Sequence, residues 1–203
     1  SVATLLSGLY PTTHQAKDLN SRVPGTVRLM SEVFQEAGFE TAAFVANGYV
    51  SDRFGFARGW DRFVNLQRDG TSPASHDASR VFADALGWIR SLGRGDRFFA
   101  YVHTVDPHVP YDPPAQFLRM YDDTEYAGGV VPGATAQLLE DIKGGRRQLS
   151  TRDRLRLEAL YDGEVTYHDQ QLGLFLGQLR ELGRLDDTLV VVTADHGEEF
   201  FDH

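Results

Sequence analysis

Asp195 and His196 lie side by side at the end of an apolar run, and side chains of their kind bind divalent metal ions. A carboxylate oxygen and an imidazole nitrogen can both coordinate such an ion, and Gly197 lets the backbone turn sharply behind them. The preceding residues 189–192, Leu-Val-Val-Val, predict a short strand that a parallel sheet buries on both faces. Charge cannot lie along the middle of such a strand. We therefore place the Asp-His pair at its carboxyl end, where open α/β sheets bind ligands.

A second apolar strand, predicted at residues 97–103, is also followed by polar residues of chemical interest. His103 ends this strand, and His108 follows in the sequence Asp-Pro-His-Val-Pro-Tyr. An imidazole can bind an anionic oxygen or transfer a proton near neutral pH, so both histidines are candidate site residues. On spacing alone, His108 is more simply a solvated loop residue, and His103 is equally compatible with a hydrogen-bonded core position.

The composition narrows the class of protein. The chain has 203 residues and a formal net charge of −9, which argues against a nucleic-acid-binding surface. No apolar run approaches the roughly 20 residues that span a bilayer, so we expect no membrane segment in these residues. The chain contains no cysteine, so a metal site must use oxygen and nitrogen ligands. The compartment and the oligomeric state are not indicated.

Helical and strand patterns alternate along the chain. We predict helices at residues 1–9, 27–37 (with Thr26 as the N-cap), 76–92 and from 151 to about 182, and strands at 41–45, 97–103 and 189–192. Residues 106–150 are rich in Pro, Gly and Asp, and we predict a surface excursion with one short helix near Phe117. This order predicts an α/β fold with a mainly parallel sheet covered by helices.

The first eleven residues, Ser-Val-Ala-Thr-Leu-Leu-Ser-Gly-Leu-Tyr-Pro, closely resemble the segment that follows the nucleophile in the sulfatase family of the alkaline phosphatase superfamily. Ser1 matches a serine of the family motif, which implies that the nucleophile lies three residues before it, outside this sequence. A nucleophile at a helix N-terminus faces free N–H groups and the positive end of the helix dipole. Val2 departs from the family, because members that convert Cys or Ser to formylglycine usually have Arg there. The departure disfavours formylglycine and favours an unmodified Thr or Ser nucleophile. An unmodified nucleophile in turn favours phosphoryl-type or phospholipid head-group substrates over sulfate esters.

Three other segments resemble the same family, namely residues 101–111, 161–173 and 195–196. The resemblance implies that His108 binds a sulfuryl or phosphoryl oxygen or protonates the leaving oxygen, and that His103 is a weaker candidate for substrate binding. It also implies that Asp195 and His196 are metal ligands, for an ion that can be Ca, Mg, Mn or Zn.

Two further residues have less defined expectations. His14 follows Tyr-Pro at a position where relatives often have a histidine. This position is equally compatible with a structural role and with a role at the edge of the substrate site. Glu198 is predicted to belong to an acidic, exposed loop after the Asp-His pair.

As a whole, the resemblance implies a three-layer α/β sandwich with a mainly parallel central sheet, alkaline-phosphatase-like and incomplete at both ends. Residues 1–203 are then one partial catalytic domain, which we expect to be inactive by itself. The expected activity is metal-dependent hydrolysis of sulfate or phosphate esters, with a small-molecule, glycan or lipid ester as substrate. Two alternatives stay open: a phosphoethanolamine or phosphoglycerol transferase, and a binding domain of this fold without catalytic activity.

Overall fold

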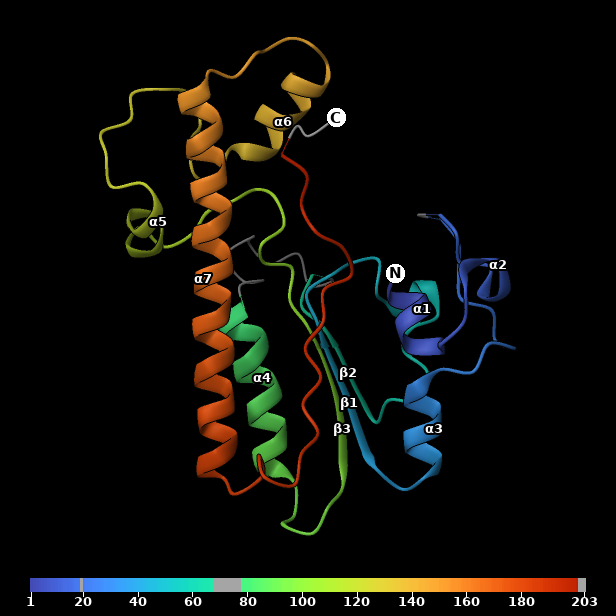
Figure 1. The fold of residues 1–203 in the computed structure, drawn as a ribbon. Helices are drawn as coiled ribbons and strands as arrows, with labels where there is room; N and C mark the ends of the chain where they lie inside the picture. The colour runs from blue at the N-terminus through green and yellow to red at the C-terminus, as the bar shows by residue number, and fades with distance from the viewer. Residues whose placement is uncertain (19, 68–77, 201–203) are drawn as a thin grey trace. The chain divides into compact units, whose positions relative to one another are not determined.

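The computed structural model describes residues 1–18, 20–67 and 78–200, which form two compact units (Figure 1). Unit 1 comprises residues 1–105 and 175–197, and unit 2 comprises residues 106–174 and the chain from residue 198 onward. Unit 1 contains α1 (Val2–Ser7), α2 (Pro11–His14), α3 (Met30–Glu36), β1 (Glu40–Val45), η1 (Asp52–Phe54), β2 (Arg62–Asn65), α4 (Ala78–Ser91) and β3 (Phe98–His103). Unit 2 contains α5 (Ala115–Tyr121), α6 (Thr135–Lys143) and most of α7 (Thr151–Glu181), whose last residues belong to unit 1.

The sheet of unit 1 is parallel, with the strand order β2-β1-β3. Val45 at the end of β1 is in register with His103 of β3 on one side and with Asn65 of β2 on the other. The hydrogen bond from Ala46 N to the His103 carbonyl, at 2.9 Å, continues the pairing by one residue. The predicted parallel α/β architecture is therefore confirmed, and His103 lies at the carboxyl edge of the sheet.

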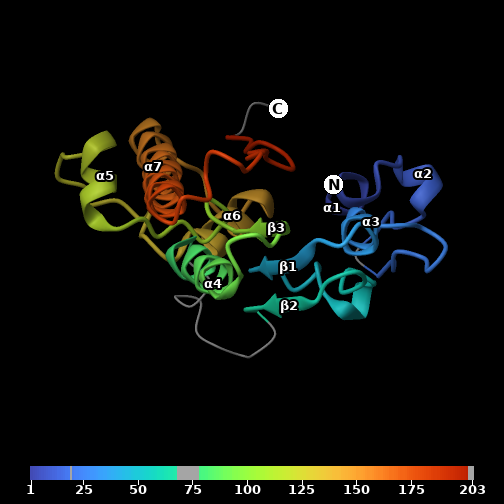
Figure 2. The same cartoon turned by 90° about the horizontal axis from the view of Figure 1, so that it is seen from below.

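Helices cover both faces of this sheet (Figure 2). Side chains alternate across a strand, so Ala43 and Val45 of β1 face one core while Ala42 and Phe44 face the other. The first core is completed by buried residues from α1 and from the loops around α3 and β2: Ala3, Leu6, Val23, Val27, Leu29, Val50, Phe56 and Trp60. The second is completed by α4 and the end of α7: Val81, Ala85, Leu86, Trp88, Ile89 and Leu179. The arrangement gives unit 1 three layers.

The helix predicted after Thr26 begins later than expected. Residues 24–27 form a turn, with Val27 N donating to the Pro24 carbonyl at 3.0 Å, and α3 starts at Met30. Glu32 supplies the cap, because its Oε2 accepts a hydrogen bond from Leu29 N at 2.8 Å. The carboxylate of Glu32 thus determines where the helix starts, and Thr26 does not.

Residues 189–192 are not a strand in the structure, contrary to the sequence prediction. Their side chains are largely solvent-exposed, to 89% for Leu189 and 74% for Val191. A β-branched apolar run favours a strand only where neighbouring strands accept its hydrogen bonds and helices cover its faces. In the described part of the chain, no strand pairs with this run.

Unit 2 has a core of its own. The predicted short helix is α5, whereas α6 is a helix that the sequence analysis did not predict. The buried side chains of this core come from the 106–150 segment and from α7: Tyr111, Leu118, Val130, Leu138, Leu157, Ala159 and Leu160. Gly163 of α7 allows a close approach of the segment before α5, because a Cβ there would lie 3.0 Å from Pro113 Cγ. Among the described residues, no helix is both long and apolar enough to cross a membrane.

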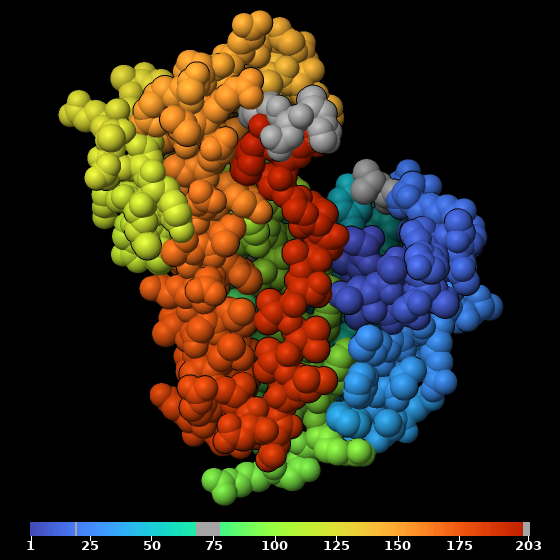
Figure 3. All heavy atoms as spheres, viewed as in Figure 1, coloured from blue at the N-terminus to red at the C-terminus, as the bar shows by residue number. Residues whose placement is uncertain are grey.

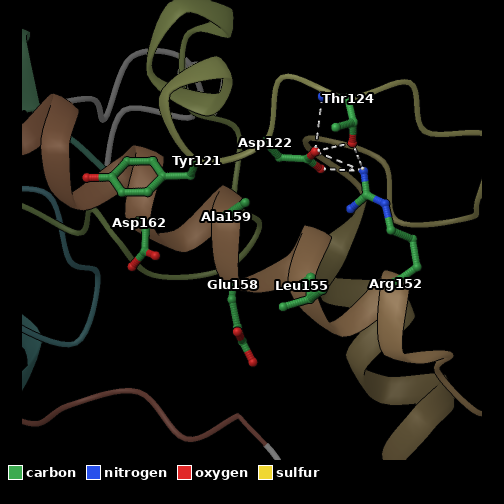
Figure 4. A pocket seen from close by; sticks show the side chains of 8 residues that line it. All are labelled: Tyr121, Asp122, Thr124, Arg152, Leu155, Glu158, Ala159 and Asp162. Carbon is green, nitrogen blue, oxygen red and sulfur yellow. Dashed lines mark hydrogen bonds and ion pairs between the residues drawn. The ribbon is translucent and has the colours of Figure 1, made fainter.

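An ion-pair cluster connects α7 to the segment after α5 (Figure 4). Asp122 Oδ2 lies 2.8 Å from Arg152 Nη2 and 3.0 Å from Arg156 Nη1, and the Asp122 side chain is only 7% exposed. Both guanidinium groups also lie over the ring of Tyr126. Burial acts to raise the pKa of Asp122, but the hydrogen bonds from Arg152, Thr124 and Arg156 outweigh it and bring the pKa to about 2.

We predict that Gly59→Ala destabilises the protein by about 2 to 4 kcal/mol. Gly59 has a φ of +70°, and a Cβ there would lie 2.6 Å from Glu32 Cα, where the backbone of α3 cannot move away. Denaturant unfolding measures the effect. Gly87→Ala is the control: this glycine lies inside α4 with open space around it, so the substitution should stabilise by about 0.5 to 1 kcal/mol. Equal effects of the two substitutions would contradict the packing described.

We also predict that acid weakens unit 2 through Asp122. A carboxylate whose folded-state pKa is lowered stabilises the fold above its unfolded pKa of about 4, and this contribution is lost as the pH falls toward about 2. Asp122→Asn should therefore remove about 2 kcal/mol near neutral pH and flatten the stability profile between pH about 4 and about 2. Denaturant unfolding across this range, with exposed Asp123→Asn as the control, measures the change.

Candidate functional site

Ser1 and Asp195, which are at opposite ends of unit 1 in the sequence, are hydrogen-bonded to each other. Ser1 Oγ donates to Asp195 Oδ2 at 2.9 Å. Ser1 is the N-cap residue of α1, so the carboxylate lies at the N-terminal end of this helix. Burial acts to raise the pKa of Asp195, but the hydrogen bond from Ser1 and the other favourable interactions of the carboxylate outweigh it and lower the pKa. Asp195 is therefore an anion at neutral pH, as a metal ligand must be.

The imidazole of His196 is oriented in a way that suits metal binding. His196 Nδ1 donates to the Gly197 carbonyl at 2.7 Å, which places the proton on Nδ1 and the lone pair on Nε2. His196 Nε2 lies 3.8 Å from Asp195 Oδ1. These two atoms are the ones that would serve as ligands of a divalent cation at this place. The donor set of one oxygen and one nitrogen fits a divalent cation.

These two residues supply only part of a coordination shell. Within residues 1–18, 20–67 and 78–200, no group of three or more His, Asp or Glu side chains is arranged to hold one metal ion. The assignment of Asp195 and His196 as metal ligands therefore stays a prediction.

His103 lies within electrostatic range of Asp195, in the same unit. Burial lowers the pKa of His103, and the negative charge of Asp195 only partly opposes this effect. The hydroxyl of Tyr101 is 3.2 Å from His103 Nδ1, so the two side chains on the same face of β3 orient each other. Burial and the charge of Asp195 raise the pKa of Tyr101, which keeps its hydroxyl protonated. Sequence reasoning did not identify Tyr101, although its two-residue spacing from His103 on a strand indicates a shared face.

His14 has a structural position. Its side chain is only 1% exposed and accepts a hydrogen bond at Nδ1 from Ala16 N, at 3.1 Å. The remaining proton is then on Nε2, which lies 3.1 Å from Thr4 Oγ1 in α1. The structure favours the structural alternative, because this histidine connects α2 to α1 from within the core.

His108 lies in unit 2 and is solvent-exposed. Its Nδ1 donates to the Val109 carbonyl at 2.7 Å, so the neutral ring has its lone pair on Nε2. Tyr111, three residues later, donates from its hydroxyl to Glu198 Oε2 at 2.7 Å. Sequence reasoning assigned Glu198 to an exposed acidic loop and did not identify Tyr111. The roles of His108 and His103 in substrate binding stay predictions.

A pocket of about 340 Å³ lies on unit 2 beside the Asp122 cluster (Figure 4). It is lined by Tyr121, Asp122, Thr124, Arg152, Leu155, Glu158, Ala159 and Asp162. Three of its polar side chains are paired with one another, since Arg152 Nη2 is hydrogen-bonded to both Asp122 and Thr124. The sequence analysis assigns no chemical role to any of these residues.

Comparison with known proteins identifies the family. The family model described as Sulfatase matches residues 1–203. An arylsulfatase of Clostridium perfringens is 28% identical over 133 residues, which cover 63% of this chain and 28% of that protein.

Solved structures with the same fold include the phosphonate monoester hydrolase of Agrobacterium radiobacter, with a TM-score of 0.73 and 18% identity over 99% of this chain and 53% of that one. Another, solved with its substrate D-glucosamine-2-N,6-O-disulfate, has a TM-score of 0.67 and 14% identity over 91% of this chain and 53% of that one. The chain thus spans between about a quarter and a half of the length of these proteins. On the match to its whole length, it belongs to the sulfatase family.

Proposed function

We propose that this chain is part of the catalytic domain of a metal-dependent hydrolase of sulfate or phosphate esters. The observation that carries the proposal is the hydrogen bond of 2.9 Å between Ser1 Oγ and Asp195 Oδ2. It brings the start of α1, the segment that resembles the one after the family's nucleophile, onto the predicted metal pair. The nucleophile and the cation must meet at one place in such an enzyme, and this contact supports that requirement.

In this proposal Asp195 and His196 hold the divalent cation. A divalent cation held by these two residues would supply a lower pKa to the nucleophile and positive charge opposite the transferred group. The lowered pKa of Asp195 keeps the carboxylate charged, and the Gly197 carbonyl holds the ring of His196 with Nε2 as the ligand atom. The hydroxyl of Ser1 holds Asp195 Oδ2 in position, so Oδ1 is the oxygen nearer to His196.

His108 and His103 contact the ester in this proposal. His108 is exposed, and in its protonated form its Nε2 can donate a hydrogen bond to a non-bridging oxygen or a proton to the leaving oxygen. His103 is half-buried and held by Tyr101, which suits a neutral hydrogen-bonding partner of the transferred group. Sulfate esters of sugars are the first substrates to test, because a neighbour of this fold was solved with a sulfated glucosamine. Phosphonate and phosphate monoesters follow, from the similarity to a phosphonate monoester hydrolase.

We predict that Asp195→Ala in the full-length protein abolishes metal-dependent turnover, with a fall of at least about 1,000-fold in kcat/KM, because the anionic ligand is lost. Hydrolysis of 4-nitrophenyl sulfate and of 4-nitrophenyl phosphate, with Mn²⁺ or Zn²⁺ added to metal-free protein, measures it.

Asp187→Ala is the matched control, since this exposed carboxylate precedes the same apolar run and has no part in the proposed site. Wild-type turnover by the Asp195→Ala variant on both esters would show that the metal role is wrong. A wild-type protein that binds the metal but turns over no ester would instead favour the binding domain. Transfer of a phosphoryl-type group to an added alcohol would favour the transferase.

The role of His108 can be separated into its two alternatives by varying the leaving group. If His108 protonates the leaving oxygen, His108→Ala should lower the rate of hydrolysis of alkyl esters, whose alcohols are poor leaving groups, by about 100-fold or more. The rate for esters of 4-nitrophenol, a good leaving group, should fall far less. If His108 binds a non-bridging oxygen, the loss should be the same for both. Rates for a matched series of aryl and alkyl esters measure the difference, and unchanged rates throughout would exclude both roles.

A further inference from the structure

The ring of Tyr101 is held by the sheet of unit 1 and by a buried indole. Tyr101 lies in β3 and is in register with Ala43 of β1. Its ring stacks on that of Trp60, with 6.3 Å between the centroids and 27° between the planes. Trp60 is itself buried, and its Nε1 donates to the Phe56 carbonyl at 2.9 Å. The backbone and the ring of Tyr101 are therefore both fixed, and so is the place of its hydroxyl.

The hydrogen bond between this hydroxyl and His103 Nδ1, at 3.2 Å, has a definite direction. Among the residues that the structure describes, this ring nitrogen is the only hydrogen-bond partner of the Tyr101 hydroxyl. A phenol that accepted here would leave its own proton without an acceptor in the protein, against the ring of Trp60, at a cost in free energy. The hydroxyl of Tyr101 therefore donates to Nδ1, and the proton of the neutral imidazole of His103 is on Nε2.

His103 Nε2 is accessible to solvent at the carboxyl edge of the sheet. None of the described residues forms a hydrogen bond with this nitrogen. In the described part of the chain, Arg156 Nε is the only buried side-chain nitrogen or oxygen without a partner, so His103 Nε2 is not buried. The charge of Asp195 acts on the ring of His103, and the run that leads to Asp195 lies at the surface (Figure 3). An N–H donor is thus presented to solvent within electrostatic range of the predicted metal ligand.

Two other histidines have the opposite tautomer. His196 Nδ1 donates to the Gly197 carbonyl and His108 Nδ1 to the Val109 carbonyl, both at 2.7 Å, so each neutral ring has its lone pair on Nε2. A lone pair suits a metal ion or an incoming proton, whereas an N–H group suits an anionic oxygen. Of these three histidines, His103 is the one whose neutral ring presents a donor at Nε2.

We infer that Tyr101 is a positioning residue, which fixes His103 as an Nε2–H donor to a negatively charged oxygen of the ester. This inference rests on the proposed function. Tyr101 touches no substrate in it and acts through the imidazole. Its hydroxyl holds one tautomer and one orientation of the ring of His103, so the binding of an anionic oxygen requires neither a proton shift nor a rotation of the ring.

The tautomer can be measured by ¹⁵N–¹H correlation spectra of the full-length protein with ¹⁵N-labelled imidazoles. Wild-type His103 should give a protonated Nε2 signal and an acceptor-type Nδ1 signal, which the His103→Ala variant identifies by their loss. Tyr101→Phe keeps the ring on Trp60 and removes the hydroxyl, so both signals should move toward the average of two exchanging tautomers. Tyr49→Phe removes an exposed phenol of the same unit and should leave them unchanged. A proton on Nδ1 of wild-type His103 would overturn the inference, even if Tyr101→Phe fails to fold.

Turnover of 4-nitrophenyl sulfate and 4-nitrophenyl phosphate by the full-length protein tests the part of this pair in the reaction. His103→Ala loses a hydrogen bond to a charged oxygen and should lower kcat/KM roughly 10- to 100-fold, whereas Tyr101→Phe should lower it about 3- to 10-fold. In the His103→Ala background, Tyr101→Phe should have no further effect, because the phenol acts through the imidazole. His103→Gln, whose amide supplies an N–H near the place of Nε2, should restore most of the activity. An equal loss from Tyr101→Phe with and without His103 would show a merely structural role and overturn the inference.

Asp195→Ala separates this inference from the proposed function. If Asp195→Ala hydrolyses both esters as the wild type does, the proposed function fails, whichever tautomer His103 has. If Asp195→Ala is inactive while His103→Ala keeps wild-type kcat/KM, only the inference fails.

Discussion

β1 is hydrogen-bonded to a parallel strand on each side, and its residues from Thr41 to Val45 are buried. Such a strand has no room for a charged side chain along its length, because both faces contact apolar cores. Charged side chains can appear only where the strands begin or end. The register that places Val45 beside His103 therefore determines where the chemistry of unit 1 lies, and the pairing of Tyr101 with His103 follows from it.

The parts of the fold that the sequence predicts well are those whose pattern is local. Strands β1 and β3 are short apolar runs between helices, and α4 has apolar residues at helical spacing. In each case the local pattern alone predicts the observed secondary structure. The run at 189–192 is apolar, as most of β3 is, but it is exposed, because a strand also depends on the neighbours with which it pairs. Helix α6 was missed for the opposite reason: its few apolar residues are buried by α7 and by Tyr111, which are distant in the sequence.

The candidate site also contains features that a local pattern predicts and features that it does not. Adjacent residues with side chains of the metal-binding kind, such as Asp195 and His196, can be recognised directly in the sequence. The hydrogen bond that orients Asp195 cannot be recognised in the sequence, since Ser1 and Asp195 are 194 residues apart. A hydroxyl such as that of Ser1 has many potential partners, and only the folded backbone selects one. Sequence reasoning therefore finds the groups that perform chemistry more readily than the groups that hold them.

The two oxygens of Asp195 illustrate why the holding groups matter. A carboxylate that rotates freely presents either oxygen to a cation, and each metal-binding event must then fix one more torsion angle. The bond from Ser1 to Oδ2 restrains this rotation before any ion binds, and the bond from His196 Nδ1 to the Gly197 carbonyl does the same for the imidazole. Neither of the two restraining groups is itself a proposed metal ligand. A neutral hydroxyl suits the first task better than a charged donor would, because it orients the carboxylate without neutralising the charge that would attract a cation in the proposed site.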